Sequence, residues 1–233
     1  VERVFHASAI FRPDYELTNP YYSFHVNLEG MLNICEAARI LGLGRVVFAG
    51  TVGEYIHGTV DYSSEPLTEY LEMYDPTMGA EPYSASKMAS TIIGLCYWKH
   101  EGVDWINTRF SRVWGFGAKR ETTQSEALII ENAVDGRPTV LVEGDSKRGQ
   151  TYVRDLAVGV LSALDIDGER LKHRVFNLGG DWMASDRDVA NIVKEFIPEA
   201  RIRVGRGGVS RRAFSTELAR EELGWKPLHD LRS

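Results

Sequence analysis

The feature that constrains the fold most is a repeated switch between helix-like and strand-like spacing of apolar residues. Residues 19–41 carry apolar side chains at helical spacing, and Gly42 ends that pattern. Residues 45–50 then form a short, almost continuous apolar run, which is typical of a strand buried on both faces of a parallel sheet. A helical pattern over 83–100 and a strand pattern over 105–110 repeat the alternation. Together these patterns predict an α/β fold with a parallel sheet.

The second half of the chain is less regular but continues to mix the two kinds of element. Ser185 precedes a helical pattern, and Asp188 stands three residues later, which predicts an acidic variant of the capping box. We expect helices over 123–134, from near 155, over 185–196 and over 214–223, and strands over 139–142 and 175–178.

Composition excludes several classes of protein. The 233 residues carry 27 Lys and Arg against 33 Asp and Glu, a net charge of −6, which argues against a nucleic-acid partner or an acidic membrane surface. No apolar run approaches the roughly 18 residues of a membrane span. The six histidines show no paired metal spacing, so we expect no metal site. Cys35 and Cys96 lie in helical patterns and no charged-then-apolar leader opens the chain, so we expect a cytoplasmic protein.

Tyr83 and Lys87 are the strongest local sign of chemistry. They stand four residues apart at a predicted helix start, so their side chains share one face. A tyrosine titrates near 10 in water, and an ammonium one turn away favours the phenolate, which suits Tyr83 to proton transfer near neutral pH. The alternative is a solvated lysine beside a half-buried tyrosine, because pairs at this spacing are common on helix surfaces.

Thr51 follows the buried strand of residues 45–50. Ligands gather beyond the carboxyl ends of strands in a parallel sheet, so the Thr51 hydroxyl could bond a substrate oxygen beside Tyr83. The alternative is that Thr51 merely ends the strand.

At this point the chain resembles the extended short-chain dehydrogenase/reductases, the NAD-dependent epimerase/dehydratase family. Tyr83 and Lys87 match the family's Tyr-x-x-x-Lys, and Asn27 to Gly30 resembles its Asn-x-x-Gly helix. Further matches follow in family order over nearly the whole chain: the strand ending in His6-Ala7-Ser8-Ala9, the Thr-bearing segment 45–55, Arg109 to Gly117, Arg148 to Asp155, and Leu223-Gly224-Trp225-Lys226-Pro227.

The resemblance implies a role for each matching residue. Tyr83 would be the acid/base, Lys87 would lower its pKa and hold the nicotinamide ribose, and Thr51 would position the reacting hydroxyl. Ser8 and Ala9 would lie against the cofactor, with Asn27 as support beside it. Arg148 falls where relatives hold a nucleotide-sugar diphosphate, although an ordinary surface arginine is the alternative.

Two features depart from the family pattern. The chain lacks the phosphate-binding Gly-x-x-Gly-x-x-Gly. The nearest candidate is residues 50–53, which follow a strand, but no amphipathic helix comes after them. We expect that loop to precede Val1, and we expect the 233 residues alone to bind dinucleotide poorly. Arg112 stands where relatives often have a substrate-facing Asn, so it could receive a carboxylate or phosphate.

Two smaller features stay open. Phe116 replaces a common Pro. Tyr70, Met73, Tyr74 and Met78 precede Tyr83 and could line a substrate pocket or pack the loop against the protein.

The resemblance implies a Rossmann-like doubly wound sheet lacking its N-terminal βαβ portion, over residues 1–118. Residues 119–233 would mainly bind substrate, with about 151–181 partly returning to the sheet. The implied function is an NAD- or NADP-dependent epimerase, dehydratase or reductase acting on a sugar or nucleotide sugar, as a homodimer through helices near 20–41 and 83–100. The alternative is a non-catalytic binding or regulatory protein on the same scaffold, although relatives of that kind typically lose the Tyr or the Lys.

Overall fold

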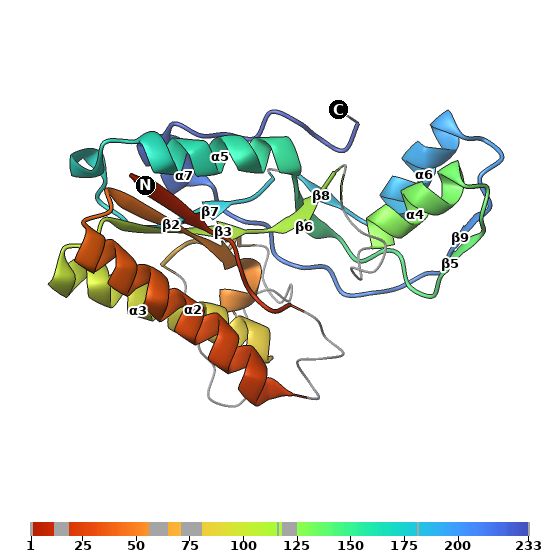
Figure 1. Cartoon of the computed structure of the whole chain (residues 1–233). Helices are drawn as coiled ribbons and strands as arrows, with labels where there is room; N and C mark the ends of the chain where they lie inside the picture. The colour runs from red at the N-terminus through yellow and green to blue at the C-terminus, as the bar shows by residue number, and fades with distance from the viewer. Residues whose placement is uncertain are drawn as a thin grey trace.

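The computed structural model describes residues 2–11, 19–55, 65–70, 81–115, 117, 125–180 and 182–232 (Figure 1). Its centre is a parallel sheet with the strand order β1-β2-β3-β7. The predicted α/β class with a parallel sheet is therefore confirmed, and the architecture is Rossmann-like. The four strands are β1 (Arg3–His6), β2 (Arg45–Thr51), β3 (Trp105–Phe110) and β7 (Val175–Leu178).

Helices cover both faces of this sheet. Helices α2 (Pro20–Leu41) and α3 (Pro82–Glu101) lie on one face, and α5 (Val153–Asp165) and α7 (Glu217–Leu223) lie on the other (Figure 1). Successive side chains of a strand point to opposite faces. Val46 and Phe48 accordingly pack in the core under α2 and α3, whereas Val47 packs in the core under α5 and α7. This burial on both faces explains why β2 reads as a continuous apolar run.

Local signals set most helix boundaries. The Asn19 side chain accepts the Tyr22 N–H at 3.2 Å and caps α2, and Gly42 ends the helix at φ 63°. The predicted capping box is present, because Ser185 and Asp188 bond reciprocally at the start of α6 (Asp186–Phe196).

One helix boundary was predicted wrongly. The pattern over 214–223 predicts a helix from Phe214, but α7 begins at Glu217. Phe214 instead forms a bridge with Leu67 and lies buried against Tyr55. Its apolar side chain belongs to a small core beneath η1 (Val52–Tyr55) and not to the helix.

The C-terminal part has a core of its own. Helices α4 (Ser125–Val134) and α6 pack with β5 (Thr139–Leu141) and β9 (Ile202–Val204) around Ile129 and Val189. A small sheet of β4 (Arg112–Trp114), β6 (Arg148–Tyr152) and β8 (Met183–Ala184) lies between this part and the main sheet (Figure 1). The sequence pattern did not predict this small sheet. The helix start expected at residue 123 and the domain boundary expected at 118/119 lie outside the described residues. A short 3-10 helix, η2 (Gly168–Arg170), follows α5.

Candidate active site

Thr51 and Tyr83 lie on neighbouring elements at the carboxyl edge of the main sheet. Thr51 is the last residue of β2, and Tyr83 lies in the first turn of α3. The turn after Thr51 packs directly on that first turn, because a Cβ on Gly53 would lie 2.5 Å from the Ser84 hydroxyl. A side chain at this position would therefore displace the Ser84 hydroxyl. The end of β2 and the start of α3 therefore form one surface.

Lys87 is buried beside this surface. Lys87 is only 3% exposed, and its Nζ donates to the Ala49 carbonyl at 2.7 Å. The ammonium stands 4.5 Å from the ring centroid of Phe48 and 5.7 Å from that of Tyr83. Lys87 is thus no solvated surface lysine, and this alternative is wrong. Burial lowers the pKa of the Lys87 ammonium to about 8, while the nearby Glu54 charge opposes that shift.

Asn27 ties three segments together behind Tyr83. Its Oδ1 accepts the Ile10 N–H at 2.7 Å, and its Nδ2 donates to the Ser86 hydroxyl at 3.0 Å. Ser86 in turn donates to the Tyr83 carbonyl at 2.8 Å. The segment after β1, helix α2 and the first turn of α3 are therefore fixed relative to one another.

The residues expected to touch a cofactor follow β1. Ser8 is exposed and Ala9 is half-buried, and both precede the Ile10 that Asn27 holds. Phe11 comes next, and its ring centroid lies 4.5 Å from that of Tyr83. Sequence reasoning missed Phe11, which carries no motif.

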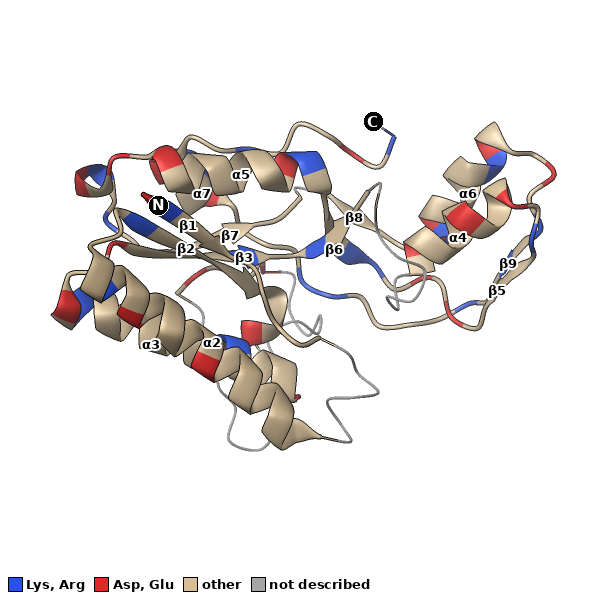
Figure 2. Cartoon of the chain, in the orientation of Figure 1, with Lys and Arg blue, Asp and Glu red and all other residues tan. Residues whose placement is uncertain are grey.

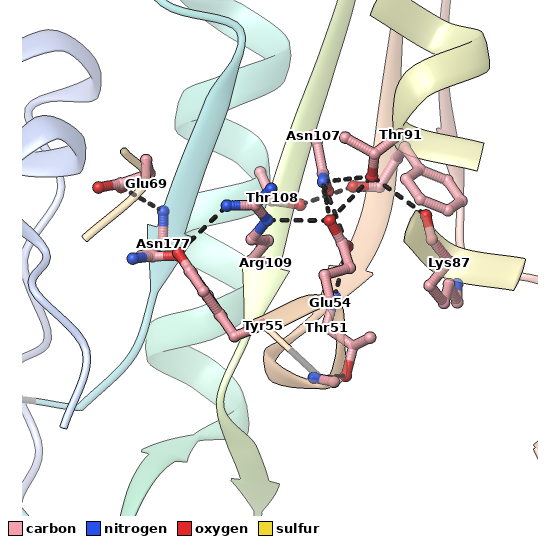
Figure 3. Close-up of polar contacts among 12 residues, drawn as sticks. Thr51, Glu54, Tyr55, Glu69, Lys87, Thr91, Asn107, Thr108, Arg109 and Asn177 are labelled. Atoms are coloured by element: carbon pink, nitrogen blue, oxygen red, sulfur yellow. Dashed lines mark hydrogen bonds and ion pairs between the residues drawn. The ribbon is translucent and has the colours of Figure 1, made fainter. Parts of the chain in front are cut away.

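A buried polar network lies on the far side of Thr51 (Figure 3). We call Glu54, Thr91, Asn107 and Arg109 the Glu54 network. The Glu54 carboxylate is fully buried and bonds Arg109 Nε at 2.9 Å, Thr91 Oγ1 at 2.9 Å and Asn107 Nδ2 at 3.0 Å. Its other oxygen accepts the Thr51 N–H at 3.0 Å.

Arg109 extends these contacts toward β7. Its Nη1 donates to the Tyr55 hydroxyl at 3.1 Å, which donates to Asn177 Oδ1 at 2.7 Å. Burial raises the pKa of Tyr55 to about 12. Sequence reasoning assigned no role to Glu54 or Arg109. A signal was present, because two opposite charges stand in or beside neighbouring apolar strands, where a lone charge is costly.

Arg112 and Arg148 meet at one carboxylate. Arg112 Nε donates to Glu126 Oε2 at 2.9 Å, and Arg148 bonds Glu126 Oε1 at 3.4 Å and Asp186 Oδ2 at 3.0 Å. Their side chains are 26% and 22% exposed. The structure therefore brings together the two arginines that the sequence singled out. They lie where β6 meets α4 and α6, and blue and red segments of the ribbon neighbour each other in this region (Figure 2).

Of the four loop residues Tyr70, Met73, Tyr74 and Met78, the structure describes only Tyr70. Its hydroxyl lies 2.6 Å from His173 Nε2, and the residue is 69% exposed. Met73, Tyr74, Met78 and Phe116 lie outside the described residues. Within the described part of the chain, no three His, Cys, Asp or Glu residues are grouped to hold a metal, and no helix is long and apolar enough to span a bilayer.

Comparison with known protein families identifies a match. Residues 1–179 match the model of the NAD dependent epimerase/dehydratase family. The chain belongs to this family. The match spans the main sheet and both segments that carry Thr51, Tyr83 and Lys87, as the sequence motifs predict.

Relatives agree with this assignment, and solved structures share the fold. A putative UDP-glucose 4-epimerase of Methanocaldococcus jannaschii is 28% identical over 100% of this chain and 74% of its own length. The UDP-glucose 4-epimerase of Corynebacterium glutamicum is 29% identical over 98% of this chain and 72% of its own length. A Thermotoga maritima UDP-glucose 4-epimerase with UDP-glucose superposes with a TM-score of 0.81 at 21% identity, covering 99% of this chain and 74% of that one. An L-threonine dehydrogenase of Phytophthora infestans superposes with a TM-score of 0.85 at 17% identity. This match covers 100% of this chain and 75% of that one.

Proposed function

We propose that the protein oxidises a hydroxyl group of a sugar or nucleotide sugar, using NAD or NADP, at a site made by Thr51, Tyr83 and Lys87. The observation that carries the proposal is the buried Lys87 ammonium, which lies beside the Tyr83 ring at the carboxyl edge of the sheet. A buried cation is costly, and such perturbed groups concentrate at functional sites. The nucleotide-sugar epimerases and dehydratases among the relatives support the substrate class.

The residues present fit the nicotinamide end of a dinucleotide. Lys87 uses one of its three donors on Ala49, so two remain to hold ribose hydroxyls. Ser8 and Ala9 stand at the carboxyl end of β1, where a parallel sheet binds its ligands. When bound, the dinucleotide supplies the hydride acceptor.

Tyr83 is the proposed acid/base. Its phenolate oxygen takes the proton from the substrate hydroxyl as the carbon's hydride leaves, so the C–O bond becomes C=O. The Lys87 ammonium favours the phenolate by its charge, and burial strengthens that attraction. The Phe11 ring packs against the Tyr83 ring, with the two ring centroids 4.5 Å apart.

Thr51 is the proposed orienting group. Its Oγ1 accepts the Gly53 N–H at 3.2 Å, so its own hydrogen can be donated to the substrate oxygen. This fixes the oxygen between Thr51 and Tyr83, and alignment of this kind contributes strongly to rate.

Arg148 and Arg112 are the proposed substrate-binding arginines. A guanidinium matches a diphosphate or carboxylate bidentately. Both side chains keep partial exposure while holding Glu126, so a substrate anion can share them.

We also propose a homodimer through α2 and α3. Large apolar side chains stand exposed on the outer sides of these helices, and their burial against a second copy would be favourable. They include Tyr21 at 79%, Ile40 at 67%, Leu41 at 71% and Ile92 at 60% exposure.

A panel of nucleotide sugars with NAD or NADP tests the proposed function. An epimerase yields the epimer with no net cofactor reduction, a dehydratase yields a keto-deoxy sugar, and a dehydrogenase accumulates reduced cofactor. Free sugars and L-threonine complete the panel, since L-threonine dehydrogenases share the fold. The assay uses the full-length protein. Binding of dinucleotide and nucleotide sugar without turnover of any member would favour the non-catalytic alternative.

A further inference from the structure

The Glu54 carboxylate is enclosed entirely by hydrogen-bond donors. The Thr51 N–H, the Thr91 hydroxyl, the Asn107 amide and the Arg109 guanidinium all point at its two oxygens (Figure 3). An ionised carboxylate is acceptor-only and has about four lone-pair sites, so it matches this set, whereas an amide would turn an N–H toward another donor. The surroundings therefore specify a charged Glu54.

One end of Glu54 controls the turn that carries Thr51. The 3.0 Å bond from the Thr51 N–H fixes the backbone where β2 enters η1. A side chain on Gly50 would collide with both the Glu54 carboxylate and Asn107, so glycine is needed for the carboxylate to reach this place. The Thr51 hydroxyl bonds Gly53 within the same turn. The direction of that hydroxyl thus depends on the turn that Glu54 holds.

The other end of Glu54 controls the helix that carries Tyr83 and Lys87. Glu54 Oε2 accepts the Thr91 hydroxyl at 2.9 Å, and Thr91 lies one helical turn after Lys87. Asn107 Nδ2 donates to Thr91 Oγ1 at 2.8 Å and also to Glu54, which ties the same point of α3 to β3. The position of α3 along the sheet is therefore fixed at Thr91.

We propose that Glu54 is a positioning residue that sets the distance between the Thr51 hydroxyl and the Tyr83–Lys87 face of α3. This inference rests on the proposed function, and it adds a residue to which the sequence analysis assigned no role. Glu54 touches none of the reacting groups through its side chain. It acts through the Thr51 backbone on one side and through Thr91 on the other. Arg109 neutralises the carboxylate, so the link is held by a paired and fully bonded charge.

A purely structural role for Glu54 predicts a different experimental result. In that case, loosening one of its bonds would lower stability alone, and turnover of the folded protein would be unchanged. A positioning role predicts that kcat falls while KM stays, because misplacing an orienting hydroxyl by about 1 Å costs rate without removing substrate contacts.

Thr91→Val is the sharpest test, because Glu54→Gln would leave Arg109 buried without its charge partner and is expected to fold poorly. Thr91→Val keeps the shape of the side chain and removes its hydrogen bonds to Glu54, to Asn107 and to the Lys87 backbone carbonyl. We expect kcat of the full-length enzyme to fall about ten-fold with KM within about two-fold, and Thr91→Ser to restore kcat. Thr139→Val is the matched control, since it removes another buried threonine hydroxyl bonded by an asparagine amide, in β5.

Hydrogen exchange at the Thr51 amide gives a readout that does not need turnover. We expect this amide to exchange slowly in the unmodified protein and faster in Thr91→Val, with no change in Thr139→Val. Equal kcat in Thr91→Val and the unmodified enzyme, an equal loss in Thr139→Val, or an unchanged Thr51 amide would overturn the inference. If no substrate is turned over, the proposed function fails, and the exchange result still decides whether Glu54 holds the Thr51 turn.

Discussion

The Glu54–Arg109 pair and the Glu126–Arg112–Arg148 group use the same residue types in different surroundings. Arg109 and Glu54 have side chains 3% and 0% exposed, whereas Arg112 and Arg148 are 26% and 22% exposed around a buried Glu126. A fully buried pair must keep its geometry, because either charge alone would be very costly. A half-exposed arginine can instead turn toward water or an anionic ligand. The first group is suited to fixing a site, and the second to binding substrate.

Arg109→Met is expected to have the largest effect. It leaves the Glu54 carboxylate buried without its cation, and breaking such a pair typically costs about 3–5 kcal/mol of the free energy of unfolding. Urea unfolding followed by far-UV circular dichroism measures the loss. A cost below about 1 kcal/mol would mean that water reaches Glu54 and that the two groups do not differ.

Lys87 extends the comparison to a buried cation that bonds a carbonyl instead of a carboxylate. Its pKa lies near 8 in the folded protein and at 10.5 ordinarily, so the folded state disfavours the charged form. The cost is present in full below pH 8, where both states are protonated, and it disappears as pH rises from about 8 to 10.5. At 1.36 kcal/mol per pKa unit this is about 3 kcal/mol at neutral pH.

We therefore expect Lys87→Met to raise the free energy of unfolding at pH 7 by up to about 3 kcal/mol while removing turnover. The gain should shrink steadily above pH 8. Urea unfolding of both proteins from pH 7 to pH 10 checks this. Equal stability at pH 7, or a gain that grows with pH, would show that the buried ammonium carries no such cost.

Arg112→Met is expected to have the smallest effect on stability. Glu126 keeps the Gln150 amide at 2.8 Å and Arg148 at 3.4 Å, so its charge stays partnered. We expect a loss of about 1 kcal/mol or less in the same urea experiment, with KM for an anionic substrate raised. A loss as large as that of Arg109→Met would remove the distinction between the two groups.

The sequence predicted the parts of this molecule that depend on neighbouring residues. The alternation of apolar spacing predicted the α/β sheet, and Gly42 and the Ser185–Asp188 box marked helix ends through bonds that span only a few residues. The Tyr83 and Lys87 spacing placed both on one face of α3 for the same reason.

The parts that the sequence did not predict depend on pairings between distant segments. The Glu54 network exists because β2 and β3 pair in the register that sets Gly50 opposite Arg109. Phe214 lies outside the predicted helix because it forms a bridge with Leu67, which is distant in the sequence. The small sheet of β4, β6 and β8 likewise joins segments separated by long connections. The local spacing of residues does not encode the register between distant segments, so these features could not be predicted from the sequence.

Turnover by Tyr83→Phe tests the central claim most directly. This change removes only the phenolic oxygen and leaves the ring that contacts Phe11 and lies near the Lys87 ammonium. With a substrate found in the panel, we expect kcat to fall at least about a hundred-fold, as is typical for a lost acid/base group, with dinucleotide affinity little changed. Activity equal to that of the unmodified protein would remove Tyr83 from the chemistry and contradict the proposed site.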